Sequence, residues 1–438
     1  MPSNNLQAAA ESIFTLLNAQ EIIDPHTHIM PLQPASRHLN DLLGYHYYTE
    51  LVHSSGTPRE RIESVDLTPD QRVKQLVEGL GSLSNTVQLQ WLHEIAVDLF
   101  GFDEPELTPA NCGKLLELSA SKMAAPDWPD QVLRRCRVSA VMLTNDFDDP
   151  LDGFDTARYM PCLRTDELVF HLAKPTVRER LTQCSGIDIG SLEGLRQAIA
   201  QRFRHFLSRG ARACAISLPP DFVPQKISDT AAQNAWDQTL KAGSNTADQE
   251  AQRTLSQFVF WTLAERCEQH RLPFDLMIGV HRRVYPSGVY QGQDLYDSRV
   301  SLYEYRHLFN AFPSVYFPIS VLASVTNQEL VSYAWIFPNV IPFGHWWYSN
   351  TPSIIYRDLS HRMEAVPATK LIGYYSDAYK LEFILPKFRM YKRVLSRVLA
   401  DQFVGERNWS EQKAVDLGIK ILKSNSEIYF PARTGDSA

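Results

Sequence analysis

The sequence has few cysteines and no long hydrophobic run, and each shortage excludes a class of protein. Its 438 residues include six cysteines, and no two of them form a Cys-x-x-Cys pair. Scattered thiols favour a reduced, cytoplasmic protein over one held together by disulfides. The longest apolar stretch, Phe312–Val325, contains two prolines and is too short for a membrane-spanning helix. We therefore expect a cytoplasmic protein with no membrane partner.

The chain also lacks an excess of positive charge. It has 43 lysines and arginines against 50 acidic residues, which gives a net charge of -7. A nucleic-acid-binding protein ordinarily carries an excess of basic charge, so we expect no nucleic-acid partner. An anionic substrate must then be held by a local cation or by a metal ion. The sequence leaves the oligomeric state open, with a homo-oligomer among the options.

A His-x-His pair follows the first apolar run of the chain. Glu21–Pro25 is typical of a β-strand and leads into His26-Thr27-His28. Side chains alternate along an extended chain, so both imidazoles lie on one side of it. A second apolar run, near the other end of the chain, leads to Asp377. Two histidines and one aspartate can form a divalent-metal site if the two strands are neighbours in a closed barrel.

The ligand types suggest which metal this site would hold. Imidazole and carboxylate ligands make Zn2+ the first choice, with Mn2+ and Fe2+ as alternatives. Three protein ligands leave open positions for water or for substrate oxygens. The alternative is that the two histidines are ordinary polar side chains near a strand end and that Asp377 caps a helix at Ala378–Leu385.

Eight short apolar or β-branched runs predict eight strands, most of them separated by helical stretches. These runs are Glu21–Pro25, Val138–Thr144, Leu168–Leu172, Ala211–Leu218, Pro273–Val280, Ser314–Val321, Asn339–Gly344 and Lys370–Tyr375. Strands that alternate with helices indicate a parallel α/β sheet. A count of eight favours a (β/α)8 TIM barrel over an open, doubly wound sheet.

One long interval, residues 29–137, breaks this rhythm between the first strand and the second. Its sequence pattern predicts several helices joined by turns that contain proline and glycine. A segment inserted after the carboxyl end of a barrel strand lies on the catalytic face, so we predict a helical cap over the site. The barrel then comprises residues 1–28 and 138–438. The alternative is a separate helical domain without a catalytic role.

Six parts of the chain match motifs of one known family. They are Asp24–His28, Gly44–Tyr47, Asp146–Leu151, Ile278–Arg282, Phe343–Tyr348 and Asp377. In these motifs the chain resembles the uronate isomerases, also called glucuronate isomerases, of the amidohydrolase superfamily. The similarity is distant but covers most of the chain. It implies a barrel fold, a divalent metal and a sugar-acid substrate.

The resemblance also implies roles for single residues. His26, His28 and Asp377 would be the metal ligands, and Asp377 would also act in catalysis. His46 and Tyr47 would reach the substrate as further catalytic residues, because histidine titrates near neutral pH and suits proton transfer. The alternative for this pair is a packed aromatic cluster, since four aromatic rings run together from residue 45 to residue 48.

Three further residues are predicted to bind the substrate. Trp346 and Trp347 would wall a sugar-binding pocket, or would pack at the barrel rim. Arg282 would bind a carboxylate, or would form an exposed salt bridge.

The chain departs from the family pattern at several positions. The family's arginine after the last aspartate is replaced, because Tyr379 and Lys380 stand there. The third-strand Phe-Arg-Pro-Asp is assigned to Ala173–Thr176, with Lys174 in place of arginine. Lys174 and Lys380 are therefore the predicted carboxylate-binding replacements, although lysine offers only a point charge where arginine offers a planar fork. Each could equally be a solvated surface lysine.

Two other family positions also differ, since Ser217–Pro219 stands for a fourth-strand Asp-His and Met277 for a fifth-strand histidine.

Three functions remain open at this point. The first is the metal-assisted aldose–ketose isomerisation of a hexuronate or a related sugar acid. The second is a metal-dependent hydrolase or decarboxylase that acts on a carboxylate-bearing substrate, because a bound metal also produces a hydroxide nucleophile. The third is an inactive homologue that binds a ligand or a partner.

Overall fold

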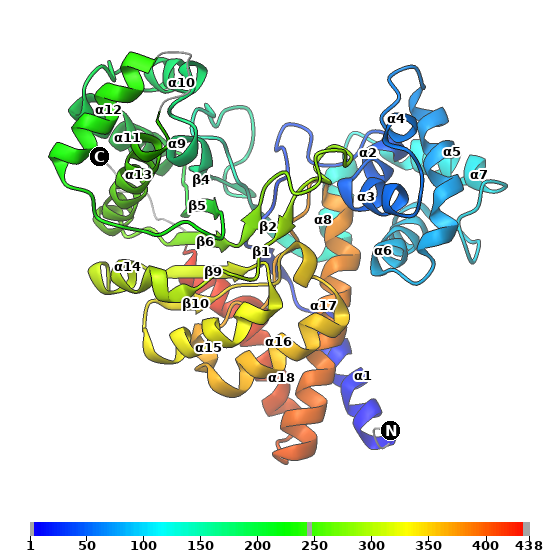
Figure 1. The fold of residues 1–438 in the computed structure, drawn as a ribbon. Helices are drawn as coiled ribbons and strands as arrows, with labels where there is room; N and C mark the ends of the chain where they lie inside the picture. The colour runs from blue at the N-terminus through cyan, green and yellow to red at the C-terminus, as the bar shows by residue number, and fades with distance from the viewer. Residues whose placement is uncertain (1–3, 243–247, 432–438) are drawn as a thin grey trace.

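The computed structural model describes residues 4–242 and 248–431, and its centre is built from parallel strands (Figure 1). One sheet has the order β1-β2-β3, with β1 at Ile22–Asp24, β2 at Val138–Met142 and β3 at Tyr159–Met160. The second has the order β10-β9-β6-β5-β4. Its strands are β4 (Cys162–Arg164), β5 (Ala213–Leu218), β6 (Phe274–Ile278), β9 (Phe317–Val321) and β10 (Val340–Pro342). A separate antiparallel hairpin pairs β7 (Val280–His281) with β8 (Leu295–Tyr296).

Further backbone contacts join the ends of these sheets. A parallel bridge between Asn145 and Leu163 connects the continuation of β2 to β4. Another bridge joins Phe343, after β10, to Ile372. Beyond Ile372 the chain runs next to the segment that follows β1, where the Asp377 amide donates to the His26 carbonyl at 3.2 Å. The first predicted strand and the last therefore lie side by side.

The strands present alternate side chains to two different cores. One set forms a small cluster whose members come from nearly all the strands: Ile23, Ala140, Met142, Met160, Cys162, Ala213, Ala215, Met277, Ile341 and Ile372. The intervening residues, such as Cys214 and Ile216 of β5, pack with the surrounding helices in a larger cluster. Both faces of the central strands β5, β6, β9 and β10 are thus buried, which explains why these strands have nearly continuous apolar sequences.

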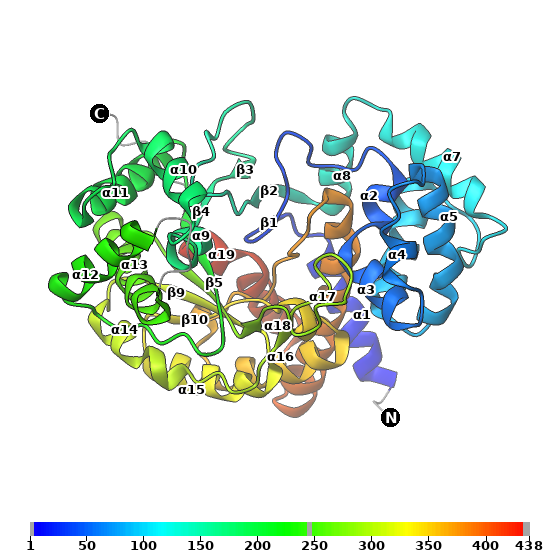
Figure 2. The same ribbon diagram turned by 45° about the horizontal axis from the view of Figure 1, so that its top comes forward.

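Helices cover the outside of the strands (Figures 1 and 2). Between β4 and β6 lie α9 (Asp166–Phe170), α10 (Pro175–Ser185), α11 (Leu192–Ser208), α12 (Asp229–Ala242) and α13 (Gln249–His270). Farther along are α14 (Arg306–Ala311), α15 (Asn327–Ile336), α16 (Pro352–Ala365), α17 (Ile384–Val398), α18 (Glu411–Ile419) and α19 (Asn425–Tyr429). The N-terminal helix α1 (Asn4–Asn18) packs against α17 and α18. No helix in these two ranges has the length and apolar character needed to cross a membrane.

The interval between β1 and β2 is helical, as the sequence predicts. It contains α2 (Leu39–Leu43), α3 (His46–Ser54), α4 (Arg59–Ile62), α5 (Pro69–Leu80), α6 (Val87–Ile95), α7 (Cys112–Met123) and α8 (Trp128–Cys136). Helix α5 begins at a capping box, in which the side chains of Thr68 and Gln71 each accept a hydrogen bond from the backbone amide of the other. Pro69 occupies the first turn, where its missing amide proton costs nothing. In both views α2 to α7 gather on one side of the strands (Figures 1 and 2).

The predicted strand at Leu168–Leu172 is wrong. Residues Asp166–Phe170 form helix α9, and the third strand comes earlier, as β3 and β4. Pro161 separates these two short strands. It makes them hard to predict from the sequence, because proline cannot donate a hydrogen bond to the sheet and so argues against a strand. The other predicted runs overlap observed strands or, for Lys370–Tyr375, the bridge at Ile372.

Replacing Gly373 with alanine is expected to destabilise the fold. A Cβ at this position would overlap the Tyr391 hydroxyl and the Ile421 side chain, both of which are buried. Overpacking of this kind costs about 1–3 kcal/mol, so the melting temperature should fall. Gly113→Ala in α7 is the matched control, since a Cβ there meets no atom within 4 Å. Equal melting temperatures for the two variants would contradict the expected clash.

Candidate active site

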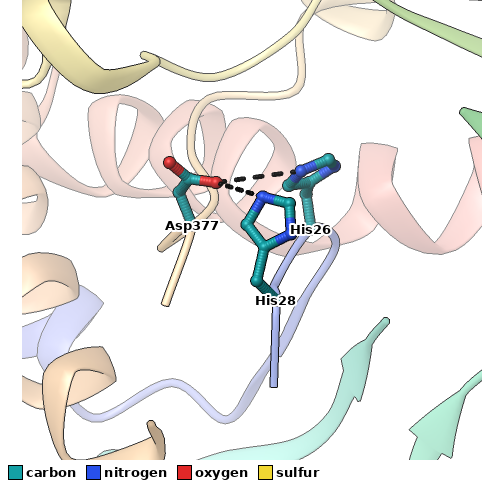
Figure 3. Close-up of side chains that lie close together, drawn as sticks. All are labelled: His26, His28 and Asp377. Atoms are coloured by element: carbon teal, nitrogen blue, oxygen red, sulfur yellow. Dashed lines mark ion pairs between the residues drawn. The ribbon is translucent and has the colours of Figure 1, made fainter. Parts of the chain in front are cut away.

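The fold brings His26, His28 and Asp377 together (Figure 3). Their candidate ligand atoms all lie within 4.8 Å of one another. Asp377 Oδ1 is 3.1 Å from His28 Nε2 and 3.8 Å from His26 Nε2. His26 and Asp377 are buried, and His28 is partly exposed.

The backbone around Asp377 is held tightly in an unusual conformation. Its φ is +54°, which lies in the left-handed region that residues with a Cβ rarely adopt. The neighbouring Ser376 amide donates to Asp24 Oδ1 at 3.0 Å, and the His28 amide donates to the Ala378 carbonyl at 2.8 Å. Backbone strain of this kind persists only where the surrounding structure fixes it, and it gathers at functional sites.

His26 is oriented by a carboxylate that the sequence analysis missed. Its Nδ1 lies 3.1 Å from Oδ2 of Asp275, a fully buried residue of β6. Because an ionised carboxylate only accepts hydrogen bonds, Nδ1 carries the proton and donates it. His26 Nε2 is then the nitrogen with a free lone pair, and it faces Asp377. A second carboxylate that fixes the tautomer in this way is a common support of metal-binding histidines.

A threonine orients His28 in the same way. Thr144 Oγ1 donates its single proton to the Thr27 carbonyl at 3.0 Å. It must therefore accept the hydrogen bond from His28 Nδ1, which lies 2.7 Å away. The lone pair of His28 is left on Nε2, which faces Asp377 as well. Both imidazoles thus present an unprotonated nitrogen to one point.

The unpartnered atoms at this point fit a cation. His26 Nε2 and Asp377 Oδ1 are buried, and neither has a hydrogen-bond partner among the described residues. Buried polar atoms are rarely left unsatisfied, because an unmade bond costs about 1–3 kcal/mol. Two lone-pair nitrogens and a carboxylate oxygen suit a divalent metal. The His26–His28–Asp377 group could therefore bind a metal.

The electrostatics differ between the two histidines, because burial lowers the pKa of His26 but the hydrogen bond and charge of Asp275 outweigh burial and raise it. Burial lowers the pKa of His28, which keeps this ring neutral. Burial opposes the charge on Asp377, but its close contact with His28 and the positive charge of Lys387 outweigh burial and hold the pKa of Asp377 below its usual value. Burial raises the pKa of nearby Asp24 to about 6, because it outweighs the hydrogen bonds from Ser376.

The group opens into a cavity with two arginines in its wall. This cavity, of about 120 Å³, is lined by His26, His28 and Asp377 and also by Arg164 and Arg282. Both arginines also line a larger adjoining cavity of about 900 Å³. Each has an acidic neighbour, because Arg164 Nε lies 3.1 Å from Asp166 and Arg282 Nη1 lies 2.6 Å from Asp294. A small anion in the inner cavity would lie near both guanidinium groups.

Four of the other predicted site residues also line the inner cavity: His46, Arg282, Trp346 and Trp347. His46 comes from α3, and its Nδ1 lies 2.6 Å from Glu50 Oε1. The remaining three predicted residues do not line this cavity. Tyr47 packs against His46 with ring centroids 4.3 Å apart, Lys380 donates to the Gln33 carbonyl, and Lys174 lines only the larger cavity.

The assignment of the third-strand motif to Ala173–Thr176 needs correction. Lys174 is the N-cap of α10, and Pro175 is the first residue of that helix. The carboxyl end of the third strand is instead formed by Leu163-Arg164-Thr165-Asp166. This segment keeps the arginine and the aspartate of the Phe-Arg-Pro-Asp pattern. Arg164 was missed because the strand itself was misplaced.

Tyr379, which stands where the family carries arginine, also lies in the site. Its ring stacks on His28 with centroids 4.9 Å apart and an interplanar angle of 29°. It is partly buried and lines the inner cavity. A neutral phenol thus occupies the space next to the histidine pair.

Removing the charge of Asp275 is expected to weaken metal binding without unfolding the protein. In Asp275→Asn the amide cannot fix His26 in a single tautomer, because it offers a donor as well as an acceptor. Loss of such a supporting partner typically costs 10–100-fold in metal affinity. Titration of metal-free protein with Zn2+ measures the change, and the circular dichroism spectrum checks the fold. Unchanged affinity would contradict the role given to Asp275.

The fold and the site together define an α/β protein with a buried centre that could bind a metal. Residues 5–430 match the glucuronate isomerase family. A uronate isomerase from Nostoc punctiforme is 23% identical over 428 residues, which cover 89% of this chain and 88% of that protein. The chain therefore belongs to the glucuronate isomerase family, which confirms the resemblance seen in the sequence.

Two solved structures share the fold. Glucuronate isomerase from Caulobacter crescentus superposes with a TM-score of 0.90 at 18% identity, covering 100% of this chain and 96% of that one. Uronate isomerase from Thermotoga maritima gives 0.88 at 19% identity, with 97% of each chain covered. At these identities the superpositions establish the α/β fold, and the family match establishes the enzyme class.

Proposed function

We propose that this protein is a metal-dependent uronate isomerase that interconverts the aldose and ketose forms of a hexuronate. The observation that carries the proposal is that one cavity contains both the His26–His28–Asp377 group and the guanidinium groups of Arg164 and Arg282. A metal centre next to two arginines suits a substrate that has hydroxyl groups and a carboxylate.

We infer that the two sheets belong to one (β/α)8 barrel. The bridges at Asn145–Leu163 and Phe343–Ile372, and the hydrogen bonds between residues 26–28 and 377–378, support closure of the ring. The single interior cluster with members from nearly all the strands supports it as well. In this arrangement residues 1–28 and 138–438 form the barrel, and residues 29–137 form a cap that brings His46 to the site.

The metal held by His26, His28 and Asp377 is proposed to be Zn2+, with Mn2+ or Fe2+ as alternatives for the same donor set. When bound, it supplies a Lewis acid that polarises substrate oxygens. The side chains around it have their own tasks. Arg164 and Arg282 hold the carboxylate of the substrate through charge-assisted hydrogen bonds. Trp346 and Trp347 form an apolar wall for the sugar.

Two groups that face the cavity can move protons. The Asp377 carboxylate is ionised at neutral pH because its pKa lies below the usual value. His46 donates from Nδ1 to Glu50, so its Nε2 is the nitrogen available to the substrate. The isomerisation moves one proton from C2 to C1 and one from O2 to O1, and it needs no external oxidant. Tyr47 packs behind His46 and supports its position.

The two predicted lysines receive lesser roles in this proposal. Lys380 holds the loop after the first strand through the Gln33 carbonyl. Lys174 contributes positive charge to the wall of the larger cavity and does not touch the metal centre.

The test is turnover of D-glucuronate and D-galacturonate by protein loaded with one equivalent of Zn2+. The expected products are the corresponding ketouronates. A protein that binds the metal and leaves both sugars unchanged would contradict isomerisation and would favour hydrolysis or decarboxylation of another carboxylate-bearing substrate. A protein that binds no metal would contradict the metal centre itself.

A further inference from the structure

A fully buried lysine lies beneath the candidate metal centre. Lys387, on α17, has no exposed side-chain surface. Its ammonium donates to the Ser376 carbonyl at 2.8 Å and to the Tyr45 hydroxyl at 3.3 Å. Three aromatic rings surround it, those of Tyr45, Tyr47 and Trp91, with centroids 5.0–5.3 Å from Nζ. A lysine is almost never fully buried unless it is paired with other groups.

The hydrogen bonds of Lys387 fix the backbone on both sides of Asp377. The Ser376 carbonyl, which belongs to the peptide group before Asp377, accepts directly from the ammonium. The Asp377 carbonyl, in the peptide group after it, accepts from the Tyr45 hydroxyl at 3.2 Å. That hydroxyl in turn accepts from Lys387. One ammonium thus anchors both peptide groups whose rotation sets the φ of +54° and the matching ψ.

The charge of Lys387 also matches the charge of the centre. Three carboxylates are buried around the two histidines, namely Asp24, Asp275 and Asp377. A divalent cation and one ammonium together offset these three negative charges. Without the ammonium, one negative charge would remain uncompensated in a buried environment, which is strongly unfavourable. Burial lowers the pKa of Lys387 to about 8, so the ammonium is still mostly charged at neutral pH.

We propose that Lys387 is a positioning residue of the metal centre, which holds Asp377 in its strained conformation and completes the charge balance of the bound ion. The inference rests on the metal centre of the proposed function and is independent of the substrate. Lys387 acts through Ser376, Tyr45 and Asp377 and does not itself line the inner cavity.

The chain offers a matched control on the same helix. Lys392 is also buried on α17, and burial lowers its pKa to about 8 as well. The charges that act on it come from Cys136, Arg137 and Arg389, and none of these belongs to the metal centre. Lys387→Met and Lys392→Met therefore remove equally buried charges, and only the first of them touches the site.

The experiment is the titration of metal-free wild-type and variant proteins with Zn2+ against a chromophoric chelator. Lys387→Met is expected to lower zinc affinity about 10–100-fold, the range for loss of a supporting partner. Lys392→Met is expected to stay within about twofold of wild type. The visible absorption spectrum of the Co2+-loaded protein should change for Lys387→Met alone, since it reports ligand geometry.

Wild-type affinity and an unchanged cobalt spectrum in Lys387→Met would overturn the inference. If Lys387→Met does not fold, Tyr45→Phe decides, because it keeps Lys387 and removes the link to the Asp377 carbonyl. That variant should bind zinc more weakly than the wild type, and wild-type binding by it would also overturn the inference. If the wild-type protein bound no zinc, the proposed metal centre would fail together with the inference. Zinc binding without sugar turnover would leave the role of Lys387 standing.

Discussion

Asp377→Asn is expected to lower kcat by about three orders of magnitude, within the range for loss of a group that transfers a proton. The amide has nearly the shape of the carboxylate, but it cannot take up a proton and is a weaker metal ligand. The wild-type carboxylate is ionised across the neutral range, because its contact with His28 and the charge of Lys387 hold its pKa below the usual value despite burial. Steady-state turnover of D-glucuronate, with the metal content measured in parallel, provides the measurement.

Glu382→Gln is the control for this variant. Glu382 is a fully buried carboxylate that accepts from the Ser36 amide at 2.9 Å and from Trp128 Nε1 at 2.8 Å. It does not line the inner cavity. The control should lower the melting temperature and leave kcat nearly unchanged. If Asp377→Asn kept wild-type turnover, Asp377 could be neither a metal ligand nor a proton-transfer group.

Arg164→Met is expected to reduce kcat/KM by about two orders of magnitude. Removing one partner of a hydrogen-bonded charge pair costs about 2–5 kcal/mol, and the substrate carboxylate would lose its guanidinium partner. Asp166, now unpaired, would also repel the substrate. Because Arg164 binds a part of the substrate that does not react, most of the loss should appear in KM. Initial rates over a range of D-glucuronate concentrations separate the two constants.

Arg283→Met is the matched control for the arginine variant. Arg283 lines the larger cavity but not the inner one. It should therefore stay within about twofold of wild type in kcat/KM, since exposed charges contribute little. If Arg164→Met behaved like this control and Arg282→Met carried the loss, the carboxylate would be bound at Arg282 alone.

Local patterns were sufficient to predict the histidine pair and its aspartate. The apolar run before His26 and the alternation of side chains place both imidazoles on one side, and the structure brings them to Asp377. The third strand was missed because Pro161 interrupts it. That error moved the predicted carboxylate-binding residue from Arg164 to Lys174. Side chains alternate between the two faces along both β4 and β6. Once β4 had been placed correctly, Arg164 could therefore have been assigned to the same face as Cys162, which lies two residues earlier.

The supporting residues could not be predicted from local patterns. Asp275 lies two positions before Met277 on β6 and therefore faces the same interior. An aspartate in a buried apolar strand is a usable signal, but its partner, His26, is 249 residues away. The bonds of Lys387 to Tyr45 and Ser376 likewise depend on how α3 and α17 meet. Contacts between elements so distant in the chain follow only from the tertiary fold.

The candidate ligands are supplied by segments that are made at very different times. The hydrogen bond between Asp24 and the Ser376 amide spans 352 residues. At a synthesis rate of about 5–20 residues per second, the ribosome adds Asp377 roughly 20–70 s after the two histidines. During that interval the nascent chain has two ligands and lacks the third. Loading of the proposed metal would therefore follow the synthesis of the last candidate ligand, and the rate of translation would set the earliest moment at which the centre can form.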